Sequence, residues 1–372
     1  MPEKRADVVV IGAGPAGSTA ARVIAKRGFI VMLVEKENNP GAASVCAGGI
    51  PMKTFRETGL SSDVIEKFIP EGAYYYPWGE QHLKLNHISV CRNLFDRKLA
   101  EKATEEGAEL RSGMLVEDVH VKNDRVVISA REKIESELVV FADGPNTLAY
   151  RKFGIGFKPK ADTTYVSVAC EIEWRENSLN CFEFHYNHAI SQWGYGWIFP
   201  KRNTVNVGVG CLYSKLSKNI IELLHYMLNK YPPTARKLSG RRMLWTGSAL
   251  IPAAPAERIF GERMLVVGDA AGMVDPVSGG GIEHAINAGR LAGDVCVNAL
   301  EEEDFSRSSL AVYQNLWRKT EDHAHIDLNH SLSNMFLYLS KFDRNAYIKM
   351  AFAVNSGIIR NLMTMVRLFM MK

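Results

Sequence analysis

Several features that define whole classes of protein are missing from this 372-residue sequence. Its six cysteines form no Cys-x-x-Cys pair and show no metal-ligand spacing. We therefore expect no iron–sulfur cluster, no metal site, and free thiols in a reducing compartment. The formal net charge of +4 is small for this length and gives no reason to expect nucleic acid as a partner.

Long apolar runs are missing too. No stretch of about 18 uninterrupted apolar residues occurs, so no membrane-spanning helix is expected. The first apolar strand begins within a few residues of Met1, which leaves no room for a signal peptide and favours a cytoplasmic protein. The length predicts about two domains, and no repeat or low-complexity tract interrupts them.

The start of the chain carries a dinucleotide-binding pattern. Residues 6–36 read ADVVVIGAGPAGSTAARVIAKRGFIVMLVEK: a buried strand, a glycine turn, an alanine-rich helix, a second strand and an acid, in that order. Gly12 permits the tight turn, Gly14 lets a pyrophosphate approach the backbone, and Gly17 lets helix and strand pack closely. The helix N-terminus suits phosphates, and the Glu35 carboxylate suits ribose hydroxyls. The complete order favours this interpretation over an ordinary turn.

A second glycine-rich junction occurs late in the chain. The apolar strand 264–267 runs into Gly268-Asp269, and a long segment of small residues then leads to a helix over 283–300. We expect Asp269 to bind ribitol or ribose hydroxyls, and the N–H groups of Gly281 and Ile282 to face a ring. The alternative, a tight surface turn, does not suit so long a run of small residues.

The middle of the chain has a different pattern. Residues 162–212 alternate in repeated strands, which predicts an antiparallel sheet inserted as a second domain. Arg92 begins a predicted helix over 92–107, where it either reaches a phosphate or lies on the surface. Residues 51–70, 214–231 and 306–372 are expected to be helical, 137–142 and 243–251 to be strands, and 109–118 and 124–131 to form a strand pair.

Together these motifs resemble the flavoproteins built like p-hydroxybenzoate hydroxylase. That family has a GxGxxG turn, a late Gly-Asp segment and a central Asp-Gly segment, which is Asp143-Gly144 here. The sequence departs from the family after this segment, because Thr147 and Arg151 stand at altered spacing from the usual serine and arginine. The resemblance implies a mixed α/β fold: an FAD-binding Rossmann-like domain with an inserted antiparallel-sheet substrate domain.

Within that superfamily the sequence resembles the geranylgeranyl reductases, including archaeal enzymes that saturate prenyl chains of membrane lipids. Residues 46–49, CAGG, resemble the family's cysteine loop over the flavin, and residues 195–200, YGWIFP, match its YxWxFP segment, although Gln192 replaces a proline common before it. The resemblance implies FAD contacts at Ala16, Glu35, Cys46, Ala47, Gly49, Arg92, Val116, Asp269, Gly281 and Ile282. The contact of Val116, a backbone contact to adenine, is implied by analogy alone.

The implied domain plan alternates between the two domains. The FAD-binding domain is expected in residues 1–70, 91–155 and 258–300, the substrate domain in residues 71–90 and 156–257, and a helical region in residues 301–372.

The implied reaction is the reduction of an isolated C=C bond. Such a bond has no carbonyl to polarise, so it needs the reduced flavin N5 as hydride donor, a separate proton source and a dry cavity. Tyr195, Trp197 and Phe199 share one strand face and are expected to form an apolar wall for an isoprenoid. Cys46 is the candidate proton donor or a flavin-shaping or redox residue, with His284 and Tyr195 as rivals.

The sequence also bears on the source of electrons and on contact with a membrane. No second GxGxxG unit is present, so either NAD(P)H visits transiently or a donor protein such as ferredoxin supplies electrons. Lys349, Arg360 and Arg367 fall within about 20° on a helical wheel. They predict either a basic segment on anionic lipid at the inner face of the membrane or a helix that closes the substrate domain. A prenylated lipid is the expected partner.

Three other functions share parts of the pattern. They are a flavin monooxygenase for an aromatic or polyketide substrate, a non-catalytic prenyl-binding escort protein, and a quinone-reducing electron-transfer dehydrogenase. The YxWxFP segment and the Cys46 loop favour the reductase over the first. The intact Gly-Asp segment disfavours the second, and the lack of clustered cysteines disfavours the third.

Overall fold

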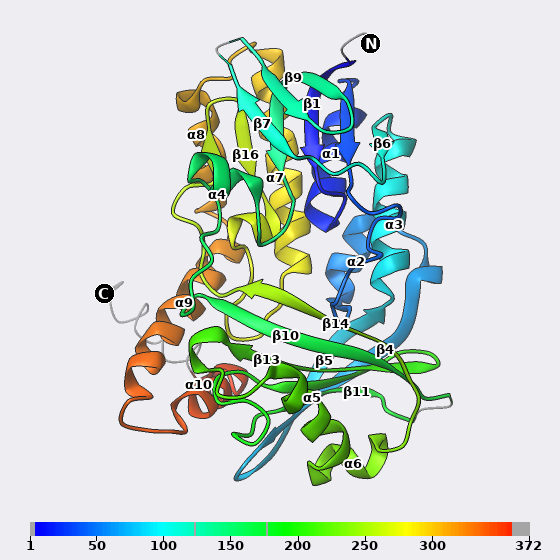
Figure 1. Ribbon diagram of the computed structural model, residues 1–372, viewed down its shortest axis with the longest axis vertical. Coiled ribbons are helices and arrows are strands. Elements are labelled where there is room, and N and C mark those ends of the chain that lie inside the picture. The colour runs from blue at the N-terminus through cyan, green and yellow to red at the C-terminus, as the bar shows by residue number, and fades with distance from the viewer. Residues whose placement is uncertain (1–3, 123, 176–177, 359–372) are drawn as a thin grey trace, which may run out of the picture.

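Two eight-stranded sheets organise the structure, one above the other in Figure 1. The structure is a computed structural model that describes residues 4–122, 124–175 and 178–358. The upper sheet has the order β15-β16-β9-β1-β2-β6, and the β7–β8 hairpin joins it through β9. Its strands are β1 (Lys4–Ile11), β2 (Val31–Val34), β6 (Glu109–Arg111), β7 (Asp118–Val121), β8 (Val126–Ser129), β9 (Lys133–Phe141), β15 (Phe260–Gly261) and β16 (Met264–Val266).

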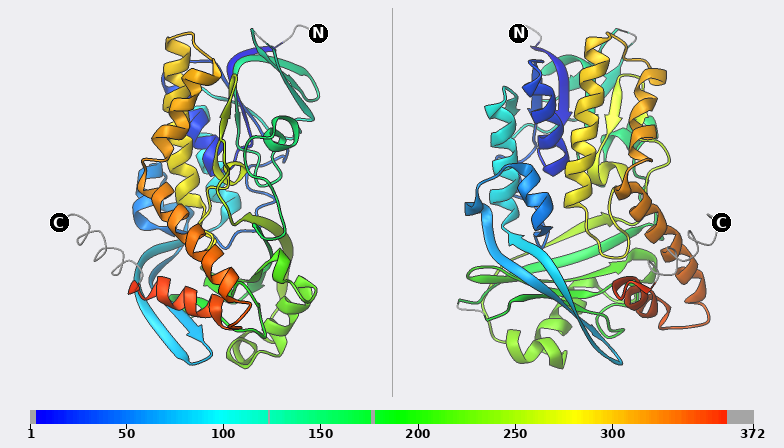
Figure 2. Two further views of the ribbon diagram at one scale, coloured as in Figure 1. Left: turned by 90° about the vertical axis from the view of Figure 1, so that its left-hand side faces the viewer. Right: turned by 180° about the vertical axis from the view of Figure 1, so that it is seen from behind.

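The centre of the upper sheet is parallel and buried. β1 pairs in parallel with β2 on one side and β9 on the other, so Val8, Val9 and Val10 are completely enclosed. Such β-branched runs are typical of strands that are covered on both faces. Four helices lie side by side on one face, as Figure 2 shows from behind: α1 (Pro15–Lys26), α3 (Arg92–Glu105), α7 (Ile282–Glu301) and α8 (Arg307–Trp317). The short helix α4 (Leu148–Phe153) lies near the β7–β8 hairpin on the other face.

The lower sheet has the order β14-β10-β13-β12-β11-β4-β5-β3. Alternation along its strands gives it two apolar faces. One face packs on α5 (Ile220–Asn229) and α6 (Pro232–Leu238), and the other carries aromatic rings. Its strands are β3 (Gly49–Pro51), β4 (Ile65–Tyr76), β5 (Gly79–Val90), β10 (Thr164–Glu173), β11 (Cys181–His185), β12 (Gly196–Pro200), β13 (Thr204–Leu212) and β14 (Met243–Pro252).

The C-terminal helices connect the two halves. α9 (Glu321–Leu339) descends along the outside from the upper sheet to the lower one, and α10 (Ala346–Asn355) then packs beside the lower sheet (Figures 1 and 2). No helix among the described residues is long and apolar enough to cross a membrane. The predicted helicity of the C-terminal region is confirmed as far as residue 358, whereas Arg360 and Arg367 lie outside the described residues.

Three local predictions were wrong. The helix expected over 51–70 is only α2 (Met52–Thr58), because Gly59 adopts a left-handed conformation, and the chain then enters β4. The strand pair expected from 109–118 and 124–131 does not form, since β6 adds to β2 and the hairpin is β7–β8. The inserted sheet is not wholly antiparallel, because β11 runs parallel to β4. Each error concerns strand pairing, which the local sequence pattern does not specify.

Candidate active site

The first glycine turn lies at the carboxyl end of β1. Gly12 has a φ of +101°, and a Cβ there would lie 2.4 Å from the Ala142 carbonyl oxygen. A Cβ on Gly17 would lie 1.9 Å from the Gly12 oxygen, which accounts for the close helix–strand packing expected there. A Cβ on Gly14 would meet nothing within 4 Å. Gly14 therefore faces open space at the N-terminus of α1, which has no side-chain cap.

The Glu35 carboxylate is held beside this turn. One of its oxygens accepts the Ala13 N–H at 2.8 Å and the other accepts the Glu37 N–H at 2.9 Å. The Glu35 carbonyl in turn accepts the Met114 N–H at 2.8 Å, which brings the loop that contains buried Val116 alongside. Carboxylate lone pairs that remain can accept hydroxyl hydrogens.

The second glycine-rich junction meets the first because α7 packs closely on α1. A Cβ on Gly289 would lie 2.3 Å from the Ala16 carbonyl oxygen, and one on Gly268 would lie 3.0 Å from the Ala16 Cβ. α7 begins after Gly281 with no side-chain cap, so the first N–H groups of the helix, including that of Ile282, have no side-chain acceptor. Helices α1 and α7, which both begin without a side-chain cap, therefore pack against each other, and such helix N-termini attract phosphates and other electron-rich groups.

The Asp269 carboxylate stands at this junction with no hydrogen-bond partner among the described residues. A Cβ on Gly281 would lie 3.4 Å from its Oδ1. Burial raises the pKa of Asp269, and the positive charge of Arg92 opposes the shift. The Asp269 carboxylate is partly exposed and has acceptor capacity left over, so it suits a ligand that brings hydroxyl groups.

Arg92 is the first residue of α3 and is not a surface arginine. Its guanidinium forms two hydrogen bonds to Asp96, at 2.8 and 2.7 Å, and its side chain is largely buried. Burial acts to lower the pKa of Arg92, but the negative charge of Asp96 and the Cys46 thiol outweigh it and raise that pKa. The positive charge of Arg92 therefore acts on both the Asp269 carboxylate and the Cys46 thiol.

The cysteine loop packs on the aromatic face of the lower sheet. Cys46 and Ala47 are partly exposed, while Gly48 has a φ of +78° and lies against the Val90 carbonyl. A Cβ on Gly49 would lie 2.7 Å from the Phe199 ring, so only glycine fits there without a shift. The loop therefore lies between the helix junction and the sheet.

Tyr195, Trp197 and Phe199 share the face that was expected. The Tyr195 and Trp197 ring centroids are 6.1 Å apart, and Phe199 stacks on Phe182 at 3.8 Å. The intervening Ile198 points to the opposite face, into the core beneath α5. An apolar cavity adjoins this wall and reaches the second glycine-rich loop and α10; it is lined by Tyr165, Gly194, Tyr195, Trp197, Gly210, Ile251, Pro276, Val277, Gly279 and Tyr347.

Trp197 is held in place from two sides. Its indole lies over Gly208 on β13, where a Cβ would come within 2.1 Å of the ring. The indole N–H donates to the Asn206 side chain at 2.8 Å, and the Asn206 amide donates to Glu171 at 3.1 Å. The glycine provides the space and the buried amide sets the orientation.

Sequence reasoning missed the residue that shapes the second loop. Asp275 accepts the Val277 N–H at 3.0 Å, the Ser278 hydroxyl at 2.5 Å and the Asn329 amide at 2.9 Å, and His325 lies 3.4 Å away. The Asp-Pro step before a run of glycines was the available signal, because aspartate commonly binds backbone N–H groups two residues on. The Tyr165 and Tyr347 cavity walls had no signal in the sequence.

The rival proton donors have other partners. The Tyr195 hydroxyl donates to the Ser278 carbonyl, and burial raises the pKa of Tyr195 far above its usual value. The Nδ1 of His284 lies 2.6 Å from an Asp322 oxygen on α9, so this histidine joins α7 to α9. Neither hydrogen bond involves the Cys46 thiol.

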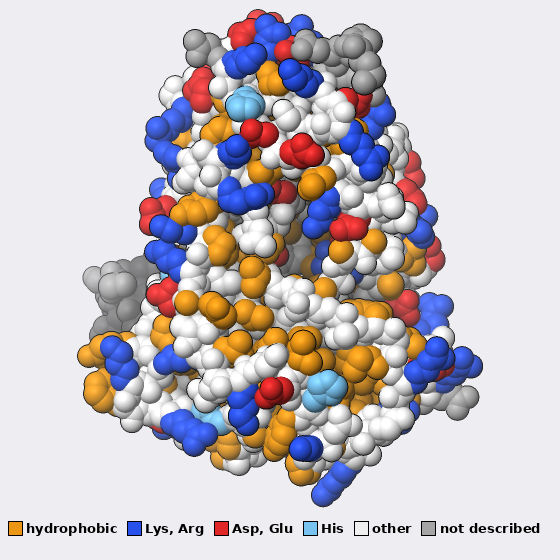
Figure 3. All heavy atoms as spheres, viewed as in Figure 1, with side chains coloured by type: hydrophobic (Ala, Val, Ile, Leu, Met, Phe, Trp, Pro, Cys, Tyr) orange, Lys and Arg blue, Asp and Glu red, His pale blue; other side chains and the backbone are white. Residues whose placement is uncertain are grey.

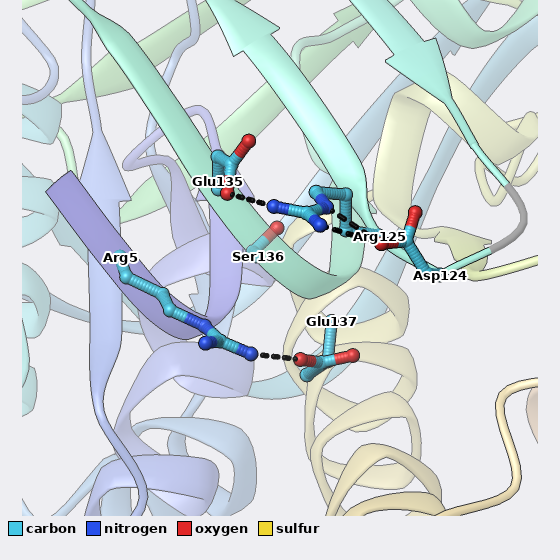
Figure 4. Close-up of a pocket in the computed structure, with 6 residues that line it drawn as sticks. All are labelled: Arg5, Asp124, Arg125, Glu135, Ser136 and Glu137. Atoms are coloured by element: carbon cyan, nitrogen blue, oxygen red, sulfur yellow. Dashed lines mark hydrogen bonds and ion pairs between the residues drawn. The ribbon is translucent and has the colours of Figure 1, made fainter. Parts of the chain in front are cut away.

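A second, polar cavity lies at the opposite end of β1 and is not part of this site. Figure 4 shows its charged side chains paired with one another: Arg5 with Glu137, and Arg125 with Asp124 and Glu135. It lies at the start of β1, whereas ligands of open α/β sheets bind beyond the carboxyl ends of the strands.

The fold and the site define a flavoprotein of the FAD-binding class. Residues 5–303 match the family model described as an FAD binding domain. Among solved structures, a geranylgeranyl bacteriochlorophyll reductase-like protein from Thermoplasma acidophilum has a TM-score of 0.83 at 23% identity, covering 89% of this chain and 87% of that one. A flavin-dependent brominase has a TM-score of 0.74 at 21% identity, covering 97% and 92%. At these identities the likeness shows the fold alone.

Curated relatives define the family more narrowly. A digeranylgeranylglycerophospholipid reductase from Methanosarcina acetivorans is 32% identical over 91% of this chain and 86% of its own length. Enzymes of the same name from Methanopyrus kandleri and Methanocaldococcus jannaschii are each 32% identical over 84% of this chain and over 86% and 82% of their own lengths. The chain belongs to the digeranylgeranylglycerophospholipid reductase family. The predicted family, fold class and FAD cofactor are confirmed.

Proposed function

We propose that this protein reduces the isolated C=C bonds of geranylgeranyl chains in archaeal-type membrane glycerophospholipids. Membership of the reductase family supports the reaction class. The observation in the structure that carries the proposal is the aromatic wall, which contacts the cysteine loop and lies beside the glycine-rich loop that leads into α7. An apolar wall at a flavin site suits an apolar chain and excludes water from the reacting carbons.

FAD fits the residues of the helix junction. The open space at Gly14 and the uncapped start of α1 suit the pyrophosphate, and the fixed Glu35 carboxylate suits the adenosine ribose. The unpartnered Asp269 suits ribityl hydroxyls, and the uncapped start of α7 suits the electron-rich edge of a flavin ring. Ala16, Ala47, Gly49, Arg92 and Val116 are proposed to complete the contact surface.

Cys46 is the proposed proton donor. Bound FAD, once reduced, supplies a hydride to one carbon of the double bond. The Cys46 thiol gives its proton to the other carbon and regains one from water, which its partly exposed loop permits. This assignment is supported by the position of Cys46 between Arg92 and the aromatic wall, and by the other hydrogen bonds of Tyr195 and His284.

The proposal includes the electron source and the place of action. Electrons are proposed to come from outside the chain, either from NAD(P)H that binds transiently or from a ferredoxin-like protein. The enzyme is proposed to work in the cytoplasm as a peripheral protein at the inner face of the membrane, because its substrate has chains that stay in a bilayer. Anaerobic reduction of the bound flavin by each donor in turn separates the two electron sources.

The test follows product mass and flavin colour together. The purified protein is reduced anaerobically with dithionite and mixed with a digeranylgeranylglyceryl phospholipid in detergent. We expect the lipid to gain two hydrogens per double bond while the flavin is reoxidised in step. An oxygen-dependent, hydroxylated product would instead indicate the monooxygenase. Lipid binding by a protein that holds no flavin would indicate the escort function, and either outcome would refute the reductase.

A further inference from the structure

The end of α9 carries an exposed apolar stripe. Met335, Tyr338, Leu339 and Phe342 recur at helical spacing and are 49%, 60%, 39% and 77% exposed. Residues at i, i+3 and i+4 lie on one side of a helix, so Met335, Tyr338 and Leu339 form a continuous surface, and Phe342 in the turn after α9 extends it. Tyr338 and Phe342 contact each other edge to face, with ring centroids 5.9 Å apart. We call these four residues the α9 stripe.

The fold does not use the α9 stripe. The flank of the same helix supplies the partly buried Leu332, Phe336 and Leu337 to the core that contains Tyr347. The other large group of exposed apolar residues in the described part of the chain is of a different kind: Met243, Leu244 and Trp245 follow one another on β14, and successive strand residues point to opposite faces. A continuous exposed apolar surface beside polar groups is typical of an interaction site.

The surroundings of the α9 stripe are basic. Residues 335–349 contain Lys341, Arg344 and Lys349 against a single acid, Asp343. All three cations are exposed, and Lys341 lies over the Tyr338 ring at 5.1 Å. Lys215 reaches the same turn through a 3.1 Å hydrogen bond to Ser340. Figure 3 shows apolar and basic side chains together at the lower left edge, where α9 ends.

The α9 stripe also adjoins the substrate cavity. The turn after Phe342 leads directly into α10, whose buried Tyr347 lines the cavity beside Tyr195 and Trp197. The same helix–turn–helix unit therefore presents an apolar, basic surface outside and a cavity wall inside. A molecule held at the stripe lies close to the wall at which a long apolar chain would bind.

We propose that the α9 stripe is the membrane-docking surface, with its four apolar side chains inserted among the acyl or prenyl chains of an anionic bilayer and its cations at the headgroups. Apolar rings and leucines flanked by lysine and arginine are the pattern that binds anionic lipid surfaces. The inference rests on the proposed function, because a substrate that resides in a bilayer would enter the cavity from the membrane, and the cavity adjoins the docking surface.

A matched pair of variants tests the surface. Leu339 in the stripe and Leu316 on α8 are both leucines near the ends of helices and are 39% and 38% exposed. We expect Leu339→Glu and Phe342→Glu each to weaken binding to vesicles with about a third phosphatidylglycerol by about tenfold, and Leu316→Glu to leave it unchanged. Wild-type binding is expected to fall with added salt and on neutral vesicles. Equal binding by Leu339→Glu and Leu316→Glu would overturn the proposal.

Further measurements separate misfolding and dimer contact from membrane docking as the reason for weaker vesicle binding. Thermal melting and flavin absorbance of each variant show whether it folds, and sedimentation shows its oligomeric state. If the stripe variants convert a dimer to a monomer, the stripe is a contact between copies and the proposal is wrong. If wild type binds vesicles but reduces no lipid in detergent, the docking surface stands and the proposed function fails. If both stripe variants still reduce lipid in detergent and lose activity only on vesicles, the result supports the docking surface and the proposed function together.

Discussion

Asp275 shows how much a single carboxylate can organise. It holds the second glycine-rich loop through Val277 and Ser278, and it ties that loop to α9 through Asn329 and His325. Burial alone would raise the pKa of Asp275, but His325, Ser278 and the Val277 N–H outweigh burial and lower that pKa to about 2. The folded protein therefore stabilises the ionised form of Asp275.

This shift predicts a pH dependence of stability. Because the folded pKa lies below the unfolded value of about 3.9, ionised Asp275 stabilises the fold above pH ~4, and the contribution is lost as pH falls toward 2. The shift corresponds to about 2–3 kcal/mol at neutral pH. We expect denaturant titrations to show a smaller loss of unfolding free energy between pH 5 and pH 2 for Asp275→Asn than for wild type. An identical loss in both proteins would contradict this role.

The proposed role of Cys46 predicts a selective loss of activity. Cys46→Ala removes the proton but little volume, so we expect lipid reduction to slow by about a hundredfold or more while FAD stays bound. Cys181 is the matched control, since it is also a partly exposed free thiol but lies on β11. Single-turnover flavin reoxidation by lipid measures the step. An unchanged rate in Cys46→Ala would contradict this role and leave Tyr195 and His284 as the candidate proton donors.

At the scale of elements, the contact between α1 and α7 builds the cofactor site. Gly289 is the point of nearest approach, because a Cβ there would lie 2.3 Å from the Ala16 carbonyl oxygen. Gly289→Ala forces the two helices apart, and overpacking of this kind costs about 1–3 kcal/mol. We expect a lower melting temperature and weaker FAD binding together. A fully stable variant with normal FAD affinity would show that the helices can shift without consequence.

Gly14→Ala is the matched substitution to Gly289→Ala, because it is expected to change FAD binding without disturbing helix packing. Gly14 has a φ of −72°, which alanine adopts without strain, and its added Cβ would enter open space. We expect the apoprotein to lose about 1 kcal/mol of stability or less, because alanine is a poorer N-cap than glycine but restricts the unfolded chain more. FAD affinity is expected to fall because the Cβ occupies the space proposed for the pyrophosphate. Normal FAD affinity, measured by flavin fluorescence titration, would place the pyrophosphate elsewhere.

At the scale of the molecule, the proposed FAD contacts come from segments that are far apart in sequence. The glycine turn, the cysteine loop, α3 and α7 contribute Gly12–Gly17, Cys46–Gly49, Arg92 and Gly281. A ligand that binds only the folded state stabilises it by about 2.7 kcal/mol at a hundred times its Kd. Removal of FAD is therefore expected to lower the melting temperature, and added FAD to restore it. A melting temperature independent of FAD would contradict this arrangement.

Prediction from sequence was accurate where a motif is local. The βαβ unit, α3, β16 and α7 were placed within a few residues, because strand, turn and helix signals lie next to one another there. Prediction was inaccurate where the pairing of strands decides the secondary structure. Residues 65–70 were expected to be helical but extend β4, since β5 supplies their hydrogen bonds. The same holds for β6, which pairs with β2 rather than with a neighbour in sequence.

The sequence by itself determined the cofactor class and the family, because glycine turns, an acid after a strand and the YGWIFP segment are short-range patterns. It also determined that Tyr195, Trp197 and Phe199 share a face, since strand alternation is local. Only the tertiary structure decided that Cys46, Arg92 and Asp269 converge, that Asp275 shapes the loop beside them, and that the α9 stripe remains exposed. These facts depend on packing between residues distant in the chain, which no local pattern encodes.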